Sequence, residues 1–430
     1  MRQPLCAKTR PVITQERSAK MLYQLHEMQR AFLRPLAEFT DAGAQWFSHP
    51  ANPLTYTPVS RQVAAGLQLV HRIGKDYHKP AWGLPTTEIG GVSVAVRENL
   101  EMAKPFCHLV RFERVLPARL AASRKDPRVL LVAPMSGHHA TLLRDTVRAL
   151  LPAHDVYVTD WVDARMVPAS AGPFHLDDYV RYVQEFIRHL GPDVHVISVC
   201  QPTVPVLAAI SLMASAGEAA QPRSMVMMGG PIDPRQSPTQ VNNLATTKSY
   251  EWFENHLIHA VPGNYRGAGR RVYPGFLQHA GFVAMNPDRH LKSHYDFYLD
   301  LLQGDDGDAE AHRRFYDEYN AVMDMPAEFY LDTIRIVFQE FRLPNGTWEI
   351  DGERVAPADI RKTALLAIEG ELDDISGVGQ TRAAVDLCRG IPKTRKHYYL
   401  AQGAGHYGIF SGRRWRNTVC PKIAEFIRQS

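Results

Sequence analysis

The sequence predicts an α/β fold, in which a mostly parallel sheet is covered by helices on both faces, and two patterns support this prediction. Between about residue 128 and residue 233, short apolar runs bounded by turn residues alternate with helical stretches. The same alternation returns after residue 362. Because strands that are buried on both faces are apolar along their whole length, we expect the two segments to build one sheet.

Residues 1–90 are predicted to form a helical extension. Apolar side chains recur every three or four residues, with Pro35 as an expected kink, at Leu22, Leu25, Phe32, Leu36 and Phe39, and again at Val63, Leu67 and Val70. Such a spacing places them on one face of a helix. We expect these helices to pack on the main domain, and anchoring at a membrane or polymer surface is the alternative.

The first part of the core is predicted over residues 91–233. An alternating strand around Val92, Val94 and Val96 opens it. The buried strands that follow are expected at Arg128–Ala133, Asp155–Thr159, Val194–Val199 and Ser224–Met228. The helices between them are expected at Leu142–Leu151, Asp177–Leu190 and Pro202–Ala216. Strands that alternate with helices in this way are typical of a parallel sheet.

Residues 234–361 are predicted to be an insertion between two strands of the sheet. This stretch is rich in aromatic residues, and we expect helices at Tyr250–His259, His294–Leu302, Arg313–Val322 and Ala327–Phe341. A helical insertion at the carboxyl edge of a sheet is where a lid over an active site lies. Its aromatic side chains would either line a substrate groove or form the core of the insertion itself.

The second part of the core is predicted over residues 362–430. Strands are expected at Thr363–Ile368 and His397–Leu400, and helices at Gln380–Arg389 and Trp415–Arg428.

Composition excludes several classes of protein. The chain has 430 residues, 45% hydrophobic and 22% charged, which is ordinary for a globular protein. No apolar run is long enough for a membrane helix. The basic start of the chain is not followed by the apolar stretch of a secretory signal. A net charge of +4 is too small to indicate nucleic-acid binding. Five widely spaced cysteines fit free thiols in a reducing cytoplasm. Because phosphate-loop, dinucleotide and zinc motifs are missing, we expect no cofactor and no metal.

Cys200 is the candidate nucleophile. It stands between the predicted strand Val194–Val199 and the predicted helix Pro202–Ala216. A tight turn at this place is typical of a nucleophile elbow, and the N-terminus of the following helix stabilises a thiolate. A cysteine that ends an apolar strand is also a common small core residue, so position alone does not identify it.

Asp373 and His406 complete the candidate site. Asp373 follows the strand Thr363–Ile368, with Asp374 as a rival carboxylate, and His406 follows the strand His397–Leu400 behind a Gly-Ala-Gly turn. The chain order nucleophile, acid, histidine is that of α/β-hydrolases. The serine in Gly91-Val92-Ser93-Val94-Ala95 resembles a serine elbow but is expected within a strand.

The oxyanion of an acyl-transfer reaction needs two hydrogen-bond donors. One is expected to be the backbone N–H of Gln201, the residue after the nucleophile. The other is expected from the loop after Arg128–Ala133, at Met135 or Ser136.

The sequence resembles the intracellular polyhydroxyalkanoate (poly-3-hydroxybutyrate) depolymerases of bacteria over nearly its whole length. The motifs that carry the resemblance are Pro105–Cys107, Ala133–His138, Ala140–Arg144, Asp160–Trp161, Phe174–Tyr179, Val199–Pro202, Gly229–Asp233, Glu369–Asp374 and Gly403–Gly408. The resemblance implies an enzyme with a Cys200, Asp373 and His406 triad. It also implies that the enzyme acts in the cytoplasm on amorphous storage granules.

Other functions are left open. Polyhydroxyalkanoate synthases use the same three residue types, but the sequence at their elbow is similar to G-x-C-x-G. The elbow of this chain, Val199-Cys200-Gln201-Pro202, does not match that motif. A hydrolase of small esters or thioesters and a non-catalytic granule-coat protein are further alternatives. The partners that we expect are the polyester substrate and no nucleic acid, and a homo-oligomer is left open.

Overall fold

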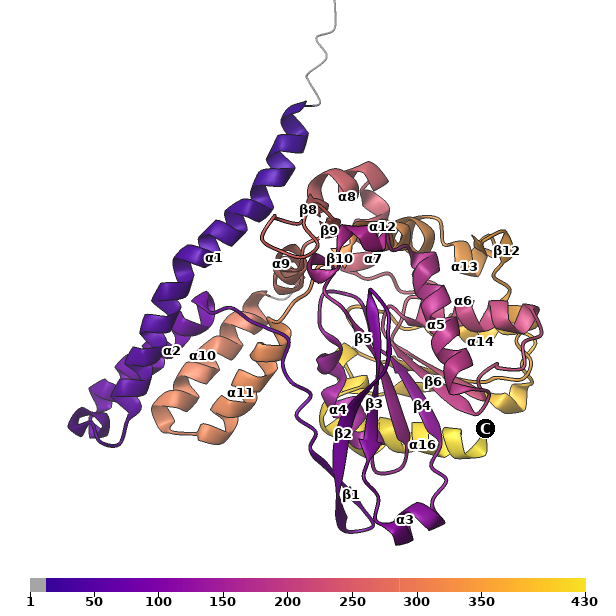
Figure 1. Cartoon of the computed structure of the whole chain (residues 1–430), viewed down its shortest axis with the longest axis horizontal. Helices are drawn as coiled ribbons and strands as arrows, with labels where there is room; N and C mark the ends of the chain where they lie inside the picture. The colour runs from indigo at the N-terminus through magenta and orange to yellow at the C-terminus, as the bar shows by residue number, and fades with distance from the viewer. Residues whose placement is uncertain (1–12, 286) are drawn as a thin grey trace, which may run out of the picture.

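The computed structural model describes residues 13–285 and 287–430, and a nine-stranded sheet forms the centre of this part of the chain (Figure 1). The order of the strands is β1-β2-β3-β5-β4-β6-β7-β13-β14. Their bounds are β1 Thr86–Ile89, β2 Val92–Ala103, β3 Cys107–Arg114, β4 Arg128–Val132, β5 Asp155–Trp161, β6 Val194–Val199, β7 Ser224–Met228, β13 Ala364–Gly370 and β14 Lys396–Ala401.

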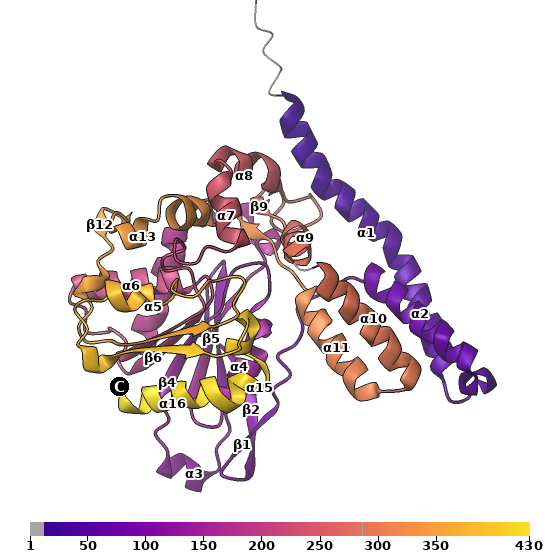
Figure 2. The same cartoon turned by 180° about the vertical axis from the view of Figure 1, so that it is seen from behind.

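Strands β5, β4, β6, β7, β13 and β14 pair in parallel, and β1, β2 and β3 form an antiparallel edge. Helices α5 (Leu176–Leu190) and α6 (Thr203–Ser215) cover one face of the sheet, and α4 (Arg144–Leu150) and α16 (Cys420–Gln429) cover the other (Figures 1 and 2). The predicted fold class is therefore confirmed, and the strand order is that of an α/β-hydrolase. No helix of the described residues is long and apolar enough to span a membrane.

The antiparallel edge was only partly predicted. The strand predicted at residue 92 extends to Ala103 and pairs with β1 and β3, so the sheet begins at Thr86 and not at residue 91. β1 has only two buried residues, and β3 carries charged residues among its apolar ones. Neither strand therefore has the continuous apolar run by which the central strands were recognised.

Three predicted helices are shorter or less regular than expected. The helix expected at Leu142–Leu151 begins as a 3-10 turn at Ala140–Leu143, and the one expected from Trp415 begins as a π-helical turn at Trp415–Val419. The one expected at Gln380–Arg389 is reduced to α14, Ala383–Leu387. The buried carboxylate of Glu369 explains this, because it accepts hydrogen bonds from the backbone N–H groups of residues 379, 381 and 382 and holds them in a turn.

The insertion, residues 234–361, is mainly helical, as expected, but also contains a small sheet, β10-β9-β8, and a hairpin, β11-β12. Its helices are α7 Gln240–Thr247, α8 Tyr250–Leu257, α9 Gly275–Met285, α10 Pro287–Gln303, α11 Asp306–Tyr319, α12 Ala327–Asp332 and α13 Arg342–Asn345. Its strands are β8 His259–Ala260, β9 Arg271–Tyr273, β10 Met325–Pro326, β11 Glu349–Ile350 and β12 Glu353–Arg354. The short helices α3 (Ala118–Ser123) and α15 (Gly412–Arg414) lie outside it.

Several aromatic side chains of the insertion are fully buried. Phe253, Phe297, Phe329 and Trp348 are each at most 1% exposed. Of these four, Phe253 lies in the insertion's own core, whereas Phe329 and Trp348 belong to the main core that surrounds the sheet.

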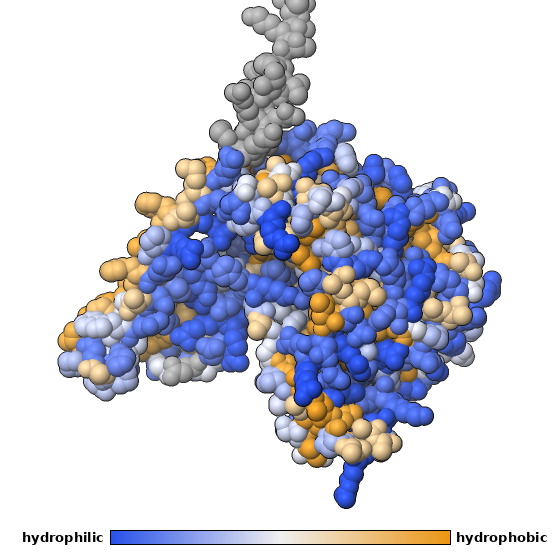
Figure 3. All heavy atoms as spheres, viewed as in Figure 1, coloured by the Kyte–Doolittle hydropathy of each residue, from blue (hydrophilic) through white to orange (hydrophobic). Residues whose placement is uncertain are grey.

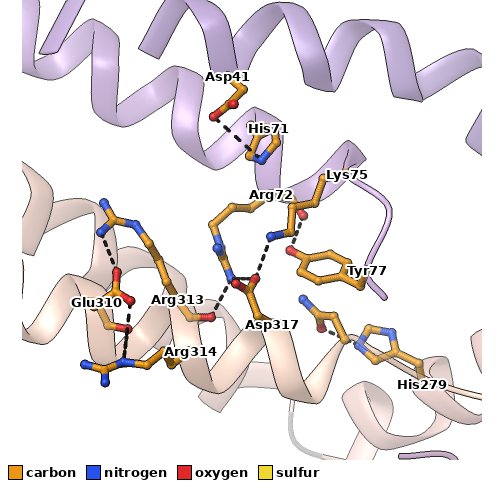
Figure 4. A network of polar contacts seen from close by, with 11 residues as sticks. Asp41, His71, Arg72, Lys75, Tyr77, His279, Glu310, Arg313, Arg314 and Asp317 are labelled. Atoms are coloured by element: carbon orange, nitrogen blue, oxygen red, sulfur yellow. Dashed lines mark hydrogen bonds and ion pairs between the residues drawn. The ribbon is translucent and has the colours of Figure 1, made fainter. Parts of the chain in front are cut away.

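Helices α1 (Ile13–Ser48) and α2 (Pro58–Gly74) pack together with α10 and α11 in a group that projects from the sheet domain, which we call the helical arm (Figures 1 and 2). α1 continues past Pro35 without a break in the helix. Ion pairs join α2 to α11, because Asp317 accepts hydrogen bonds from Arg72 at 3.0 Å and from Lys75 at 2.7 Å (Figure 4).

The helices of the extension pack on the insertion, with α2 against α10 and α1 against β8, but not through their large apolar side chains. α1 meets α2 through small side chains, with Ala37 and Ala44 of α1 and Ala64 of α2 all buried. The helices approach so closely that a Cβ added to Gly43 would lie 3.0 Å from Leu67. The large apolar side chains point outward instead, and Leu25, Phe32 and Phe39 are 60%, 81% and 73% exposed. Helical periodicity identified an apolar face but not which face the neighbouring helix covers.

A buried polar cluster joins α1 to the insertion and to the sheet. The Tyr23 hydroxyl donates to Asp324 at 2.7 Å, and Asp324 accepts a second bond from the N–H of Gly275 at 2.8 Å. The backbone N–H of Asp324 donates in turn to Asp163, which follows β5. Burial, and then the nearby charge of Asp324, raise the pKa of Asp163 to about 7, while Arg165 opposes this. The cluster therefore links three parts of the chain that are distant in sequence.

Candidate functional site

The predicted site residues follow the carboxyl ends of strands β4, β6, β13 and β14, with β7 between β6 and β13. Cys200 follows β6, the loop at Met135 follows β4, Asp373 follows β13 and His406 follows β14. The chain order β4, β5, β6 places β5 and β6 on opposite sides of β4. A crevice forms where the connections diverge in this way, and ligands of open α/β sheets bind there. The insertion lies over the same ends of the strands (Figure 1).

Cys200 has a left-handed backbone conformation, with φ of +68°. Its N–H donates to the carbonyl of Met228 at 2.7 Å, and its carbonyl accepts from the N–H of Thr203 at 3.1 Å, which starts α6. Residues other than glycine adopt this conformation at a cost of about 1–3 kcal/mol, and they do so mainly at functional sites. The turn therefore has the geometry of a nucleophile elbow.

Two glycines after β7 make room for this turn and for the groups beside it. A Cβ at Gly230 would lie 1.9 Å from the Thr203 hydroxyl and 2.3 Å from the carbonyl oxygen of Cys200. Gly229 has φ of +56°, and a Cβ there would lie 3.3 Å from the carboxylate of Asp373. Any side chain at residue 230 would therefore displace the elbow.

Asp373 binds His406 in a buried ion pair. Its Oδ2 lies 2.8 Å from Nδ1 of His406, and the two side chains are 0% and 5% exposed. Its other oxygen, Oδ1, accepts hydrogen bonds from the backbone N–H groups of Ile375 and Ser376. The rival carboxylate Asp374 is exposed. The structure thus brings Asp373, and not Asp374, to the histidine.

Cys200 interacts electrostatically with His406, and because Nδ1 faces Asp373, Nε2 is the nitrogen left for the thiol. Burial of the ring disfavours the imidazolium, but the nearby charges of Asp373 and Cys200, together with the hydrogen bond to Asp373, raise the pKa of His406 well above its usual value. By contrast, burial lowers the pKa of His138 to about 4. Of these two buried histidines, only His406 is arranged to carry a proton at neutral pH.

The loop after β4 lies next to Cys200, because Val132 pairs with Ser198 in the sheet. Its first residue is held firmly, since the Ala133 carbonyl accepts from Trp161 at 2.8 Å and from Tyr179 at 3.2 Å. In the described part of the chain, the backbone N–H groups of Met135, Ser136 and Gln201 have no hydrogen-bond acceptor. They are therefore available as donors, as the oxyanion prediction requires.

The insertion fixes the far end of this loop. Gly137 accepts a hydrogen bond from the N–H of Met323 at 2.7 Å, and His138 forms a β-bridge with Val322. A Cβ at Gly137, whose φ is +98°, would lie 2.7 Å from Gln278 of α9. The insertion therefore holds the backbone of the oxyanion loop in place.

The side chain of Gln201 is a feature that the sequence analysis did not single out. Both of its amide atoms are buried, and neither has a hydrogen-bond partner among the described residues. Leaving such an amide unpaired costs about 1–3 kcal/mol for each group. The feature that could have identified this side chain from the sequence is the presence of a glutamine directly after the candidate nucleophile.

Residues 229–430 match a family model described as "PHB de-polymerase C-terminus". This segment contains Asp373 and His406, whereas Cys200 precedes it. The predicted depolymerase family is thereby confirmed for the C-terminal part of the chain. Together with the α/β-hydrolase fold, this match supports hydrolysis of a carboxylic ester.

Similar solved structures share this fold at low sequence identity. A putative lipase from Acinetobacter baumannii AYE is 11% identical with a TM-score of 0.44, over 78% of this chain and 93% of that one. A putative non-heme bromoperoxidase from Mycobacterium tuberculosis H37Rv is 15% identical with a TM-score of 0.41, over 80% and 97%. No curated protein has significant similarity to the chain.

The Gly230→Ala variant should be destabilised and nearly inactive. The new methyl group meets backbone and a buried side chain, and overpacking of this kind costs about 1–3 kcal/mol. Urea unfolding and ester turnover would measure both effects. Gly263→Ala is the control, because nothing lies within 4 Å of a Cβ there. Wild-type turnover in Gly230→Ala would show that the elbow tolerates a side chain.

The Asp373→Asn variant should lose about 10⁴-fold in turnover, by analogy with loss of the orienting acid in other triads. Removal of the carboxylate charge lowers the pKa of His406, so the decline of the residual activity at high pH should move to lower pH. The pH–rate profile measures this shift. Asp374→Asn is the matched control and should retain wild-type turnover, and the opposite result would identify Asp374 as the partner of His406.

Iodoacetamide should alkylate Cys200 before the other described cysteines. Cys200 is only partly buried and contacts His406, whereas burial raises the pKa of Cys388 and of Cys420 to about 12 and that of Cys107 well above its usual value. Thiolates react and thiols do not. Peptide mass spectrometry after timed labelling would rank the sites. An inert Cys200 in folded, active protein would exclude it as the nucleophile.

Proposed function

We propose that the protein hydrolyses the ester bonds of amorphous poly(3-hydroxybutyrate) and related short-chain polyhydroxyalkanoates on storage granules in the cytoplasm. The observation that carries the proposal is the contact chain from Cys200 through His406 to buried Asp373, at the end of a strained elbow. The family match of residues 229–430 supports the choice of polyester as substrate.

Cys200 is the nucleophile in this mechanism. With His406 protonated, the Cys200 thiolate attacks the ester carbonyl carbon, and the carbonyl electron pair moves onto the oxygen. When this pair returns, the bond to the polymer oxygen breaks, and His406 donates its proton from Nε2 to that oxygen. One polymer fragment leaves as an alcohol, and the other remains on Cys200 as a thioester.

Water completes the reaction. Neutral His406 removes a proton from a water molecule, and the resulting hydroxide attacks the thioester carbon. The carbon–sulfur bond then breaks, which releases a carboxylic acid and restores the thiolate beside the imidazolium. Asp373 keeps Nδ1 of His406 protonated and directed away from the substrate, so that Nε2 carries the proton in both steps.

Two backbone donors stabilise the oxyanion in this proposal. The N–H of Gln201 is the first, and the N–H of Met135 or Ser136 is the second. Support comes from their lack of acceptors within the described chain and from the contacts that hold the loop after β4. Preformed donors of this kind contribute about 10²–10³-fold each to turnover.

Purified protein should release soluble 3-hydroxybutyrate from amorphous poly(3-hydroxybutyrate) granules, and Cys200→Ala should reduce this release to background. Cys420→Ala, the same substitution at a cysteine remote from His406, is the control and should stay active. Release could be followed enzymatically or by chromatography. If wild type releases nothing but cleaves 3-hydroxybutyryl thioesters, the polyester substrate is wrong. If Cys200→Ala remains active, the nucleophile is wrong.

A further inference from the structure

The outer face of the helical arm is apolar and has no partner within the described chain. Between Leu22 and Trp46, α1 exposes seven large apolar side chains by 40–81%: Leu22, Leu25, Met28, Phe32, Leu36, Phe39 and Trp46. At about 1.5 Å per residue, they cover about 36 Å of helix. α2 adds Val59, Val63, Val70 and Ile73, which are 37–82% exposed. Figure 3 shows hydrophobic atoms along the outer edge of this arm.

These side chains form one face. At about 100° per residue, the positions from Leu25 to Phe39 fall on the same side of α1, whereas Arg34 and Glu38, which pair at 3.1 Å, fall on another. The small residues Ala37 and Ala44 face α2. α1 therefore has three distinct sides, of which one is small and buried, one is charged, and one is large, apolar and exposed. Contiguous exposed apolar surface of this extent marks an interaction site.

We propose that this face docks the enzyme on the surface of the amorphous polyester. The inference rests on the proposed function for the identity of the surface. Charge supports an uncharged partner, because the described side chains of α1 include three acidic and two basic residues, Glu27, Glu38, Asp41, Arg30 and Arg34. Helices that lie on anionic membranes carry an excess of Lys and Arg on the polar face, which α1 does not have.

A second copy of the chain fits this face less well. Two-stranded helical seams use Leu, Ile and Val in a regular pattern over straight, gently supercoiled helices. The exposed face of α1 instead carries Phe32, Phe39 and Trp46, and Pro35 interrupts the helical hydrogen bonding in its middle. Flat, bulky side chains of this kind suit a disordered apolar surface, which adapts to their shape.

The docking face is also connected to the active site. Tyr23, on the buried side of α1, donates to Asp324, and the adjacent Met323 binds Gly137 of the oxyanion loop. The arm is therefore attached to the insertion that lies over the site. An enzyme held on the polymer through α1 would keep the insertion and the crevice at that surface.

Binding should be measured in the Cys200→Ala background, so that hydrolysis of the particles does not affect the measured binding. Leu25→Gln, Phe32→Gln and Phe39→Gln together should weaken cosedimentation with amorphous poly(3-hydroxybutyrate) particles at least tenfold. Val92→Gln, Leu100→Gln and Val115→Gln change three exposed apolar residues on β2 and next to β3, which are 40–61% exposed; they form the control and should bind like the parent. Circular dichroism and melting temperature would verify that both variants fold.

In the active background, the arm variant should lose about tenfold in turnover on particles but stay within twofold on a soluble 3-hydroxybutyrate trimer.

Unchanged particle binding by the arm variant overturns the proposal, as does a parent that does not bind particles. A dimer in light scattering that the arm substitutions dissociate, with particle binding intact, would make a second copy the occupant. Binding to phosphatidylglycerol vesicles but not to polyester would show that the partner of this face is a membrane. If particles are bound through α1 but not cleaved, the docking inference stands and the proposed function fails.

Discussion

The left-handed backbone of Cys200 is the constraint on which the rest of the site depends. Such a turn forms only if the chain on either side is firmly held, and β6 in the centre of the sheet and the buried helix α6 supply this support. The turn also demands that nothing occupy the space beside it, which explains the two glycines after β7. Once the thiol stands at this position, His406 and Asp373 have one way to reach it, from the two strands beyond β7. The strain at one residue thus determines where the other side chains must lie.

Much of this arrangement could be predicted from the sequence, because the strands that carry it are apolar runs with abrupt ends. Cys200, Asp373 and His406 each follow such a run, and parallel strands bring their carboxyl ends to one edge. The edge strands β1 and β3 could not be recognised, since they are half polar and obtain their stability from pairing. The outward direction of Phe32 could not be predicted either. Periodicity defines a face, but the choice of neighbour depends on how closely Ala37 and Ala44 let α2 approach, and that is a property of the assembled helices.

The insertion has a larger structural role than the sequence indicated. Its aromatic residues were expected to line a substrate groove or to form its own core, and Phe253, Phe297, Phe329 and Trp348 are fully buried. Its contact with the site is made by backbone instead, through Met323 and Val322 on Gly137 and His138. A loop that must present backbone donors benefits from such support, because preformed donors need no rearrangement during the reaction. The α/β-hydrolase core and its insertion are in this sense one structural unit.

The hydrogen bond from Tyr23 to Asp324 extends this dependence to the N-terminal helices. Asp324 is fully enclosed, and its acceptor oxygens are used by Tyr23 and by the N–H of Gly275. A shortened chain that starts at the first strand of the sheet would leave this carboxylate without its phenol and would expose the side of the insertion that α1 covers. α1 therefore contributes to the stability of the insertion that lies over the candidate site. Comparisons of enzymes that differ in this extension would have to treat the helices as part of the scaffold of the active site, and not as an appendage acquired or lost at no cost to folding.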